Sequence, residues 1–260
     1  MRKRLFFVIV LIVLVGLLSG CSQYNQPINA NSTGIWNEWF VWPLSQFITY
    51  IANLFGGSYG ISIIICTILV RLVLLPLMIK QTKGSLNMQL VQPEIKKLKE
   101  KYSSKDQETQ KKLQQETMKL FQQHNVNPLA GCLPLVIQMP ILIAFYHAIY
   151  RTHEIREHVF LWFKLGQHDP YYILPILAAI TTFISQKITM GASGNANPQL
   201  AIMTYIMPIM ILFLAVRFPA ALALYWVVGN IFMIFQTYFV IAPMRKKVNI
   251  QSDTGGAAKK

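Results

Sequence analysis

Residues 57–80 read GSYGISIIICTILVRLVLLPLMIK, and this stretch decides the fold. About 20 apolar residues, each rising ~1.5 Å along an α-helix, cross a hydrocarbon core of ~30 Å. The stretch is long enough, yet it contains Arg71, nine residues before Lys80. That spacing places Arg71 about 13 Å inside the end of the span. Because an arginine at such depth costs about 2.5–3.5 kcal/mol on insertion scales, the rest of the chain must offer it water or a polar partner.

The composition indicates an integral membrane protein with an all-α fold. Of the 260 residues, 53% are hydrophobic and 13% are charged, whereas soluble domains are about 25% charged. The net charge of +14 does not by itself indicate nucleic acid, and we expect no nucleic-acid partner. We recognise no metal-ligand cluster, nucleophile elbow or phosphate loop. The sequence therefore predicts no cofactor, no metal site and no enzyme.

The N-terminus has the features of a lipoprotein signal peptide over residues 1–20. A basic start is followed by an apolar run and then by Leu18-Ser19-Gly20-Cys21, as in secretory signals. This ending resembles a bacterial lipobox, in which the cysteine is diacylated and becomes the first residue. We expect Cys21 to be lipidated on the outer face of the plasma membrane. An uncleaved first helix is the alternative.

Residues 21–34 are predicted to be an extracytoplasmic linker, and residues 35–56 an interfacial helix on the outer surface. Tryptophan and tyrosine favour the membrane–water interface, and this segment is crowded with aromatic residues. A spanning helix is the alternative. Pro43 and several polar residues count against it: Asn37, Ser45, Gln46 and Asn53.

Residues 81–126 are predicted to form a cytoplasmic helical hairpin after the first span, 57–80. Residues 80–123 carry ten lysines against five acidic residues. A thin apolar stripe recurs at helical spacing, Ser103-Ser104 interrupts it, and a second helix is expected from Asp106 onward. The stripe consists of Val91, Ile95, Leu98 and Tyr102. Because so thin a stripe packs weakly, we expect the hairpin to be mobile.

The remaining four spans lie within residues 127–243, before a basic tail at 244–260. They are approximately 129–150, 171–190, 200–216 and 220–242. The hairpin and the tail hold fifteen lysines and arginines, whereas the other charged connections hold four. Because positive loops stay in the cytoplasm, we expect five spans in the plasma membrane, with the lipidated N-terminus outside and the C-terminus cytoplasmic.

Arg71 has no acidic partner in any span, because the five spans contain no aspartate or glutamate. An unpaired intramembrane charge must face water or a ligand; snorkelling to the surface is the alternative. Each other polar side chain, taken alone, more often joins helices than serves a function. Together they predict a wet, client-binding groove around Arg71, lined by Thr67, Gln138, Thr182, Gln186, Trp226 and Asn230.

The run NPLAGCLP at residues 127–134, followed by QMP at 138–140, resembles the signature of the YidC/Oxa/Alb membrane protein insertases. The resemblance covers about residues 35–245 and is closest to the lipoprotein type of Gram-positive bacteria. It implies five transmembrane helices around a hydrophilic groove that is open to the cytoplasm and to lipid. It also implies a protein that inserts membrane proteins and helps them fold, alone or with the Sec translocon.

The resemblance also assigns residues and partners. The family's groove arginine matches Arg71 and its groove glutamine matches Gln138, while Gln186 and Trp226 fall at matching positions. Nascent membrane proteins are the implied clients, received by the hairpin, and membrane lipids are contacts. Some relatives bind ribosomes through a long basic tail. The tail here is only some fifteen residues long, so we expect ribosome binding to be weak.

Two alternatives remain open from the residues alone. The first is a channel or carrier for small anions, with Arg71 as its selectivity charge, which predicts ion flux in liposomes. The second is a lipid-anchored scaffold, which would tolerate Arg71→Ala without loss. The absence of any intramembrane carboxylate weighs against an ordinary cation-coupled transporter.

Overall fold

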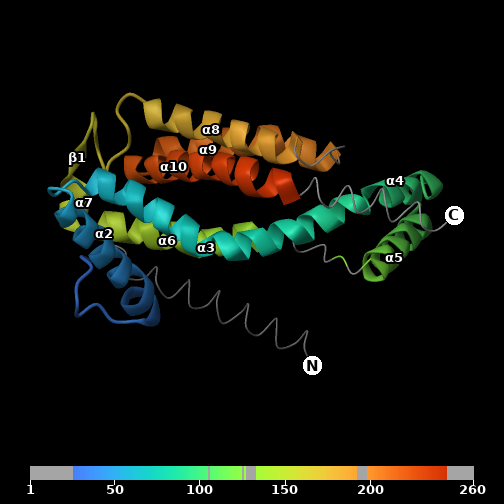
Figure 1. The fold of residues 1–260 in the computed structure, drawn as a ribbon, viewed down its shortest axis with the longest axis horizontal. Helices are drawn as coiled ribbons and strands as arrows, with labels where there is room; N and C mark the ends of the chain where they lie inside the picture. The colour runs from blue at the N-terminus through green and yellow to red at the C-terminus, as the bar shows by residue number, and fades with distance from the viewer. Residues whose placement is uncertain (1–25, 105, 125, 127–132, 192–197, 245–260) are drawn as a thin grey trace. The chain divides into compact units, whose positions relative to one another are not determined.

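The computed structural model describes residues 26–244 except 105, 125, 127–132 and 192–197 (Figure 1). Cys21 and most of the NPLAGCLP run therefore lie outside the described residues. The chain divides into two compact units. The first comprises Met1–Leu72, Ile137–Thr182 and Met207–Ile231. The second comprises Val73–Val136, Phe183–Ile206 and Phe232–Lys260.

Five long apolar helices dominate the described part of the chain, and the prediction of an all-α membrane protein is confirmed. Among the described residues, Tyr59–Gly84 and Ala220–Met244 are long and apolar enough to cross a bilayer. Ile173–Thr189 and Thr204–Arg217 are shorter apolar stretches. The five helices are α3 (Tyr59–Leu90), α6 (Leu133–Arg151), α8 (Ile173–Gly191), α9 (Pro198–Arg217) and α10 (Ala220–Gln236), the last continued by the π-helix η4 (Thr237–Ile241).

Large apolar side chains remain exposed along these helices. Val73 is 79% exposed, Phe213 63% and Tyr238 70%. Large exposed apolar surfaces are rare on soluble proteins and mark contact with a partner or a membrane. Lipid tails are the solvent that suits these side chains, in agreement with a membrane protein.

A short π-helix, η2 (Asn37–Val41), leads into α2 (Trp42–Leu54) in the first unit. One side of α2 is buried in the unit's core through Ile48, Ile51 and Ala52, and Val41 of η2 joins it. Trp39, Phe47 and Tyr50 are exposed. The chain then leaves α2 through Gly56 and Gly57, whose φ values of 64° and 83° lie in the region that favours glycine.

The connection from α6 to α8 packs onto the same core. It contains α7 (His153–Glu157) and a small antiparallel pair, β1 (Val159–Phe160) and β2 (Phe163–Lys164). The ring of Phe160 lies directly on Gly60 of α3, at a spot that a Cβ would occupy. Hence only glycine permits this contact. The core itself is formed by residues such as Phe145, Ile149, Ile155, Leu165 and Leu222.

The second unit contains the polar helices α4 (Gln92–Lys101) and α5 (Gln107–Gln123). α3 does not end at Lys80, the expected end of the first span, but runs on to Leu90. Val91, Ile95 and Leu98 of the apolar stripe pack against a matching set from α5 and the residues after it, namely Leu120, Phe121 and Val126. The hairpin thus has a small apolar core.

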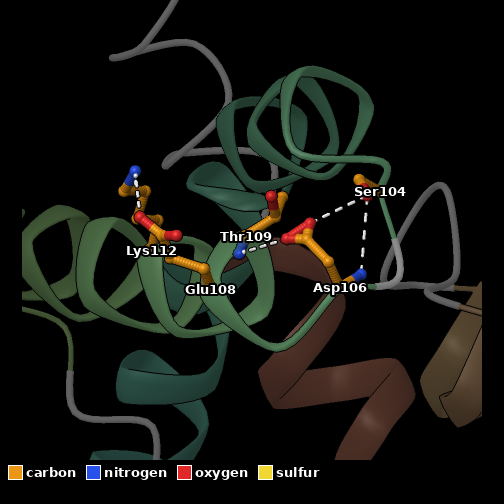
Figure 2. Close-up of polar contacts among 5 residues, drawn as sticks. All are labelled: Ser104, Asp106, Glu108, Thr109 and Lys112. Atoms are coloured by element: carbon orange, nitrogen blue, oxygen red, sulfur yellow. Dashed lines mark hydrogen bonds and ion pairs between the residues drawn. The ribbon is translucent and has the colours of Figure 1, made fainter.

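Asp106 caps the N-terminus of α5 (Figure 2). Its carboxylate accepts a hydrogen bond of 2.8 Å from the backbone N–H of Thr109 and one of 2.9 Å from the Ser104 hydroxyl. One turn into the helix, Glu108 and Lys112 form an ion pair of 2.9 Å. A capped, charged first turn explains why the second hairpin helix begins here.

Candidate functional site

Arg71 lies on α3, and its guanidinium rests against the backbone of α10. A Cβ added to Gly229 would stand 2.7 Å from Nη2 and 3.4 Å from Cζ of Arg71. The glycine therefore provides the space that the guanidinium fills. Any larger residue at 229 would push the charged group away from α10.

Arg71 is partly exposed, but the Nε of its guanidinium is buried and lacks the partner that a buried donor ordinarily has. Its Nε is buried and finds no hydrogen-bond acceptor. None of the ion pairs formed by the described residues includes Arg71. A buried donor without an acceptor is costly, and an unpaired charge more so. An acidic or strongly polar group from outside the chain would supply an acceptor for the Arg71 Nε and a partner for the positive charge.

Gln138 and Tyr225 form a second polar contact beside Arg71. The Gln138 Nε2 donates a hydrogen bond of 2.5 Å to the Tyr225 hydroxyl, joining α6 to α10. Tyr225 is 2% exposed, and its ring centroid lies 4.8 Å from that of Phe145. Tyr225 also interacts electrostatically with Arg71. Three helices of the first unit thus contribute to one polar cluster, which we call the Arg71 cluster: Arg71, Gln138, Tyr225 and Gly229.

Asn230 and Thr182 form a polar contact of their own. The Asn230 Nδ2 donates to the Thr182 hydroxyl at 2.7 Å and to the Thr181 hydroxyl at 3.2 Å. The Thr182 hydroxyl donates to the Ala178 carbonyl of its own helix at 2.6 Å. These bonds join α8 to α10, which is the usual role of such residues between membrane helices.

Thr67 and Trp226 occupy packing positions in the first unit. Thr67 is fully buried, and its hydroxyl donates to the Ile63 carbonyl at 2.7 Å, so its own helix satisfies it. Trp226 is 9% exposed, with its ring centroid 6.3 Å from that of Phe218. Gln186 belongs to the second unit and is partly exposed. The Arg71 cluster therefore contains two of the residues predicted from the sequence, Arg71 and Gln138.

Two members of the cluster were not singled out in the sequence as site residues. Tyr225 and Gly229 are four residues apart, so they share a helix face. A small residue one turn from a tyrosine, in an otherwise apolar helix, is the pattern that would have indicated a close approach. Lys187 of α8 lies outside the cluster and was also not singled out in the sequence. Its side chain is exposed, and its Nζ lies 5.8 Å from the Phe183 ring centroid.

The site offers hydrogen-bond donors and a positive charge, but no group for covalent chemistry. Among the described residues, no three or more histidines, cysteines, aspartates or glutamates are placed to hold a metal ion. The chemistry that the cluster supports is therefore the binding of an acidic or polar group.

Comparison with known proteins identifies relatives along the whole chain. The profile of the family described as "60Kd inner membrane protein" matches residues 50–247. "Membrane protein insertase YidC 2" of Bacillus anthracis is 61% identical over 259 residues, which cover 100% of both chains. "Membrane protein insertase MisCA" of Bacillus subtilis (strain 168) is 57% identical over 260 residues, covering 100% of this chain and 99% of the relative.

A solved structure shares the fold. It is described as "Active YidC insertase crystal structure with the first transmembrane domain resolved", with a TM-score of 0.60 and 26% sequence identity. The match covers 77% of this chain and 46% of the solved one, so this chain corresponds to less than half of that protein.

Proposed function

We infer how the site works from one premise: the chain belongs to the family described as 60Kd inner membrane protein, the YidC/Oxa/Alb membrane protein insertases. It is an integral membrane protein whose function is the insertion of other membrane proteins, and these are its clients. The relatives give no support to the small-anion channel considered from the sequence. The proposal concerns which residues handle the client, and how.

We propose that Arg71 attracts an acidic or polar segment of the client during insertion. The observation that carries this proposal is that the Arg71 Nε is buried without an acceptor among the described residues, and that no ion pair of these residues includes Arg71. In a site of low dielectric, attraction between opposite charges is several times stronger than in bulk water. A client carboxylate would replace the missing partner of Arg71.

The neighbours of Arg71 support a temporary binding site rather than a permanent ion pair. Gly229 lets the guanidinium lie against α10, and the Gln138 and Tyr225 side chains add polar groups beside it. Polar walls lower the cost of bringing a client's polar segment into the membrane. Since no carboxylate of the described residues pairs with Arg71, the client can bind and leave.

The driving force for transfer comes from the client and the membrane. The client's apolar helix gains by entering lipid. A membrane potential that is positive outside assists each acidic residue by about 2.3 kcal/mol per 100 mV. The mechanism needs no covalent step and no nucleotide, so we infer that the protein is not an enzyme.

Other features of the working protein remain proposals from the sequence. We propose a lipidated Cys21, an N-terminus outside and a cytoplasmic hairpin and tail, supported by the lipobox and by the uneven distribution of lysines and arginines. The hairpin would receive clients. Cooperation with the Sec translocon is part of the proposal, as is a weak interaction with ribosomes.

Insertion into proteoliposomes tests the role of Arg71. A small client with an acidic extracytoplasmic segment is added to vesicles that contain wild type, Arg71→Ala, Arg71→Lys or Arg217→Ala. We expect Arg71→Ala to lose at least ~10-fold in insertion rate, about 1.4 kcal/mol, and Arg71→Lys to retain part of it. The exposed Arg217 is the matched control and should insert like wild type. Equal rates for Arg71→Ala and wild type would remove Arg71 from the mechanism.

A further inference from the structure

We propose that Arg151 is a receptor for the chain's own N-terminal segment, and that it fixes residues 26–28 to the end of α6. Arg151 is the last residue of α6 and belongs to the first unit, as does the segment that it holds. The insertion mechanism proposed above makes no use of this arginine.

Three hydrogen bonds form the contact. The Arg151 Nε donates to the backbone carbonyl of Gln26 at 2.8 Å, and the backbone N–H of Ile28 donates to the Arg151 carbonyl at 3.1 Å. The Arg151 Nη1 donates to the Asn37 side-chain oxygen at 2.6 Å. Arg151 therefore joins the N-terminal segment, η2 and α6 at one point, which we call the Arg151 clasp: Arg151, Gln26, Ile28 and Asn37.

The clasp is a built site rather than a surface contact. Arg151 and Asn37 are each 4% exposed, and Ile28, at 7%, packs into the main core of the unit. A second buried hydrogen bond, of 2.7 Å between the hydroxyls of Ser45 and Thr152, lies in the adjoining residues. The Asn37 amide is itself oriented by its 2.8 Å bond to the Thr33 carbonyl.

The arginine depends on the segment as much as the segment depends on the arginine. No ion pair within the described part of the chain includes Arg151. Its charge is instead held by neutral oxygens, one of which belongs to Gln26. Removing a partner from a buried charge is strongly unfavourable, so the docked segment is a condition for the arginine to remain buried. The fork of a guanidinium reaches two acceptors at once, which a lysine cannot do with the same geometry.

The clasp limits where the N-terminal lipid can be, a point that rests on the lipidation of Cys21 proposed above. Gln26 follows Cys21 by only five positions, and an extended chain over five residue steps reaches at most about 17 Å. The lipid would therefore enter the outer leaflet close to the end of α6. We infer that the clasp fixes the point at which the lipid-bearing segment meets the rest of the protein.

Labelling of intact cells tests the clasp. Ile28→Cys and, as an exposed reference, Asn31→Cys are introduced without Cys66 and Cys132 and treated with a membrane-impermeant maleimide. Because a docked segment opens only locally and rarely, we expect Ile28→Cys to react at least ~10-fold more slowly than the reference. Adding Arg151→Met should bring the two rates together, and Arg151→Lys should have an intermediate effect. Arg217→Met, the matched control, should change neither rate.

A second variant and a second measurement distinguish loss of the clasp from misfolding of Arg151→Met. Asn37→Ala leaves Arg151 in place and removes one contact, so it should raise the labelling of Ile28→Cys part of the way. Hydrogen exchange on purified protein should show faster exchange of the Ile28 amide in Arg151→Met. Continued protection of residue 28 in Arg151→Met, or full labelling in the parent, would overturn the proposal.

The Cys21→Ala variant separates the contribution of the lipid to docking from that of Arg151. We expect residue 28 to stay protected without the lipid, because Arg151 holds the segment. Loss of protection in Cys21→Ala together with its retention in Arg151→Met would assign the docking to the lipid and contradict the clasp. These measurements report accessibility rather than insertion. A failure of the clasp is thus distinguishable from a failure of the Arg71 mechanism.

Discussion

At the scale of single residues, Arg71 was predicted as a site residue because a charge deep in a long apolar run is costly without water or a polar partner. Gln138 was predicted as one of the polar residues inside the spans, and the family signature gave it the same place. Tyr225 and Gly229 were not found, because their roles depend on which faces of α3, α6 and α10 meet. Helical periodicity gives the faces of each helix, but not the register between helices far apart in sequence.

Gly229→Ala tests the close contact at the site. The new Cβ would stand 2.7 Å from the Arg71 Nη2, so the flexible arginine must move, while the helix itself gains about 0.5–1 kcal/mol from the replacement of glycine. We expect thermal stability to be kept or raised and the insertion rate to fall about threefold or more, as for the loss of roughly 0.7 kcal/mol.

A double-mutant cycle supplies the control for that prediction. If Gly229→Ala acts by displacing Arg71, it should have no further effect on insertion in an Arg71→Ala background. An equal loss in both backgrounds would show that residue 229 matters for some other reason.

At the scale of elements, the apolar stripe of the polar segment indicated which residues of α4 meet α5, because a helical repeat of apolar residues is a local signal. The continuation of α3 to Leu90 was not predicted. Lys80 marks where the chain leaves an apolar environment, but a polar sequence can continue a helix. The β1–β2 pair was also missed, since two-residue strands are too short to show alternation.

The start of α5 should depend on pH through Asp106. The hydrogen bonds from Thr109, which have the largest effect, and the one from Ser104 hold the pKa of the Asp106 carboxyl below its ordinary value of 3.8. A lowered pKa in the folded state means that the cap contributes its full stability above about 3.8 and loses it as the pH falls through the lower folded value. We expect amides in the first turn of α5 to lose exchange protection on that acid side.

Asp106→Asn is the matched variant, because asparagine caps a helix without titrating. It should preserve α5 and abolish the acid transition, whereas Asp106→Ala should weaken the first turn at every pH. An acid transition that persists in Asp106→Asn would assign the effect to another group.

At the scale of the whole molecule, composition was enough to identify a helical membrane protein, and the NPLAGCLP run was enough to identify its family. The division into two units was not predicted, because it depends on packing between distant segments. The proposed orientation rests on the distribution of lysines and arginines, which acts over the whole chain during insertion. The Arg151 clasp was not predicted either. Its arginine binds the backbone carbonyl of Gln26, and every residue type has such a carbonyl, so the sequence does not indicate which one is bound.

The most direct test of the central claim is to find where a client's acidic segment lies while it is being inserted. A photocrosslinking residue placed next to a client aspartate should form adducts, mapped by mass spectrometry, with residues of α3 around Arg71 and of α10 around Gly229. Replacing that client aspartate by asparagine, or using Arg71→Ala, should reduce these adducts together with insertion. Efficient insertion with no adduct near Arg71 would contradict the proposal that this arginine receives the client.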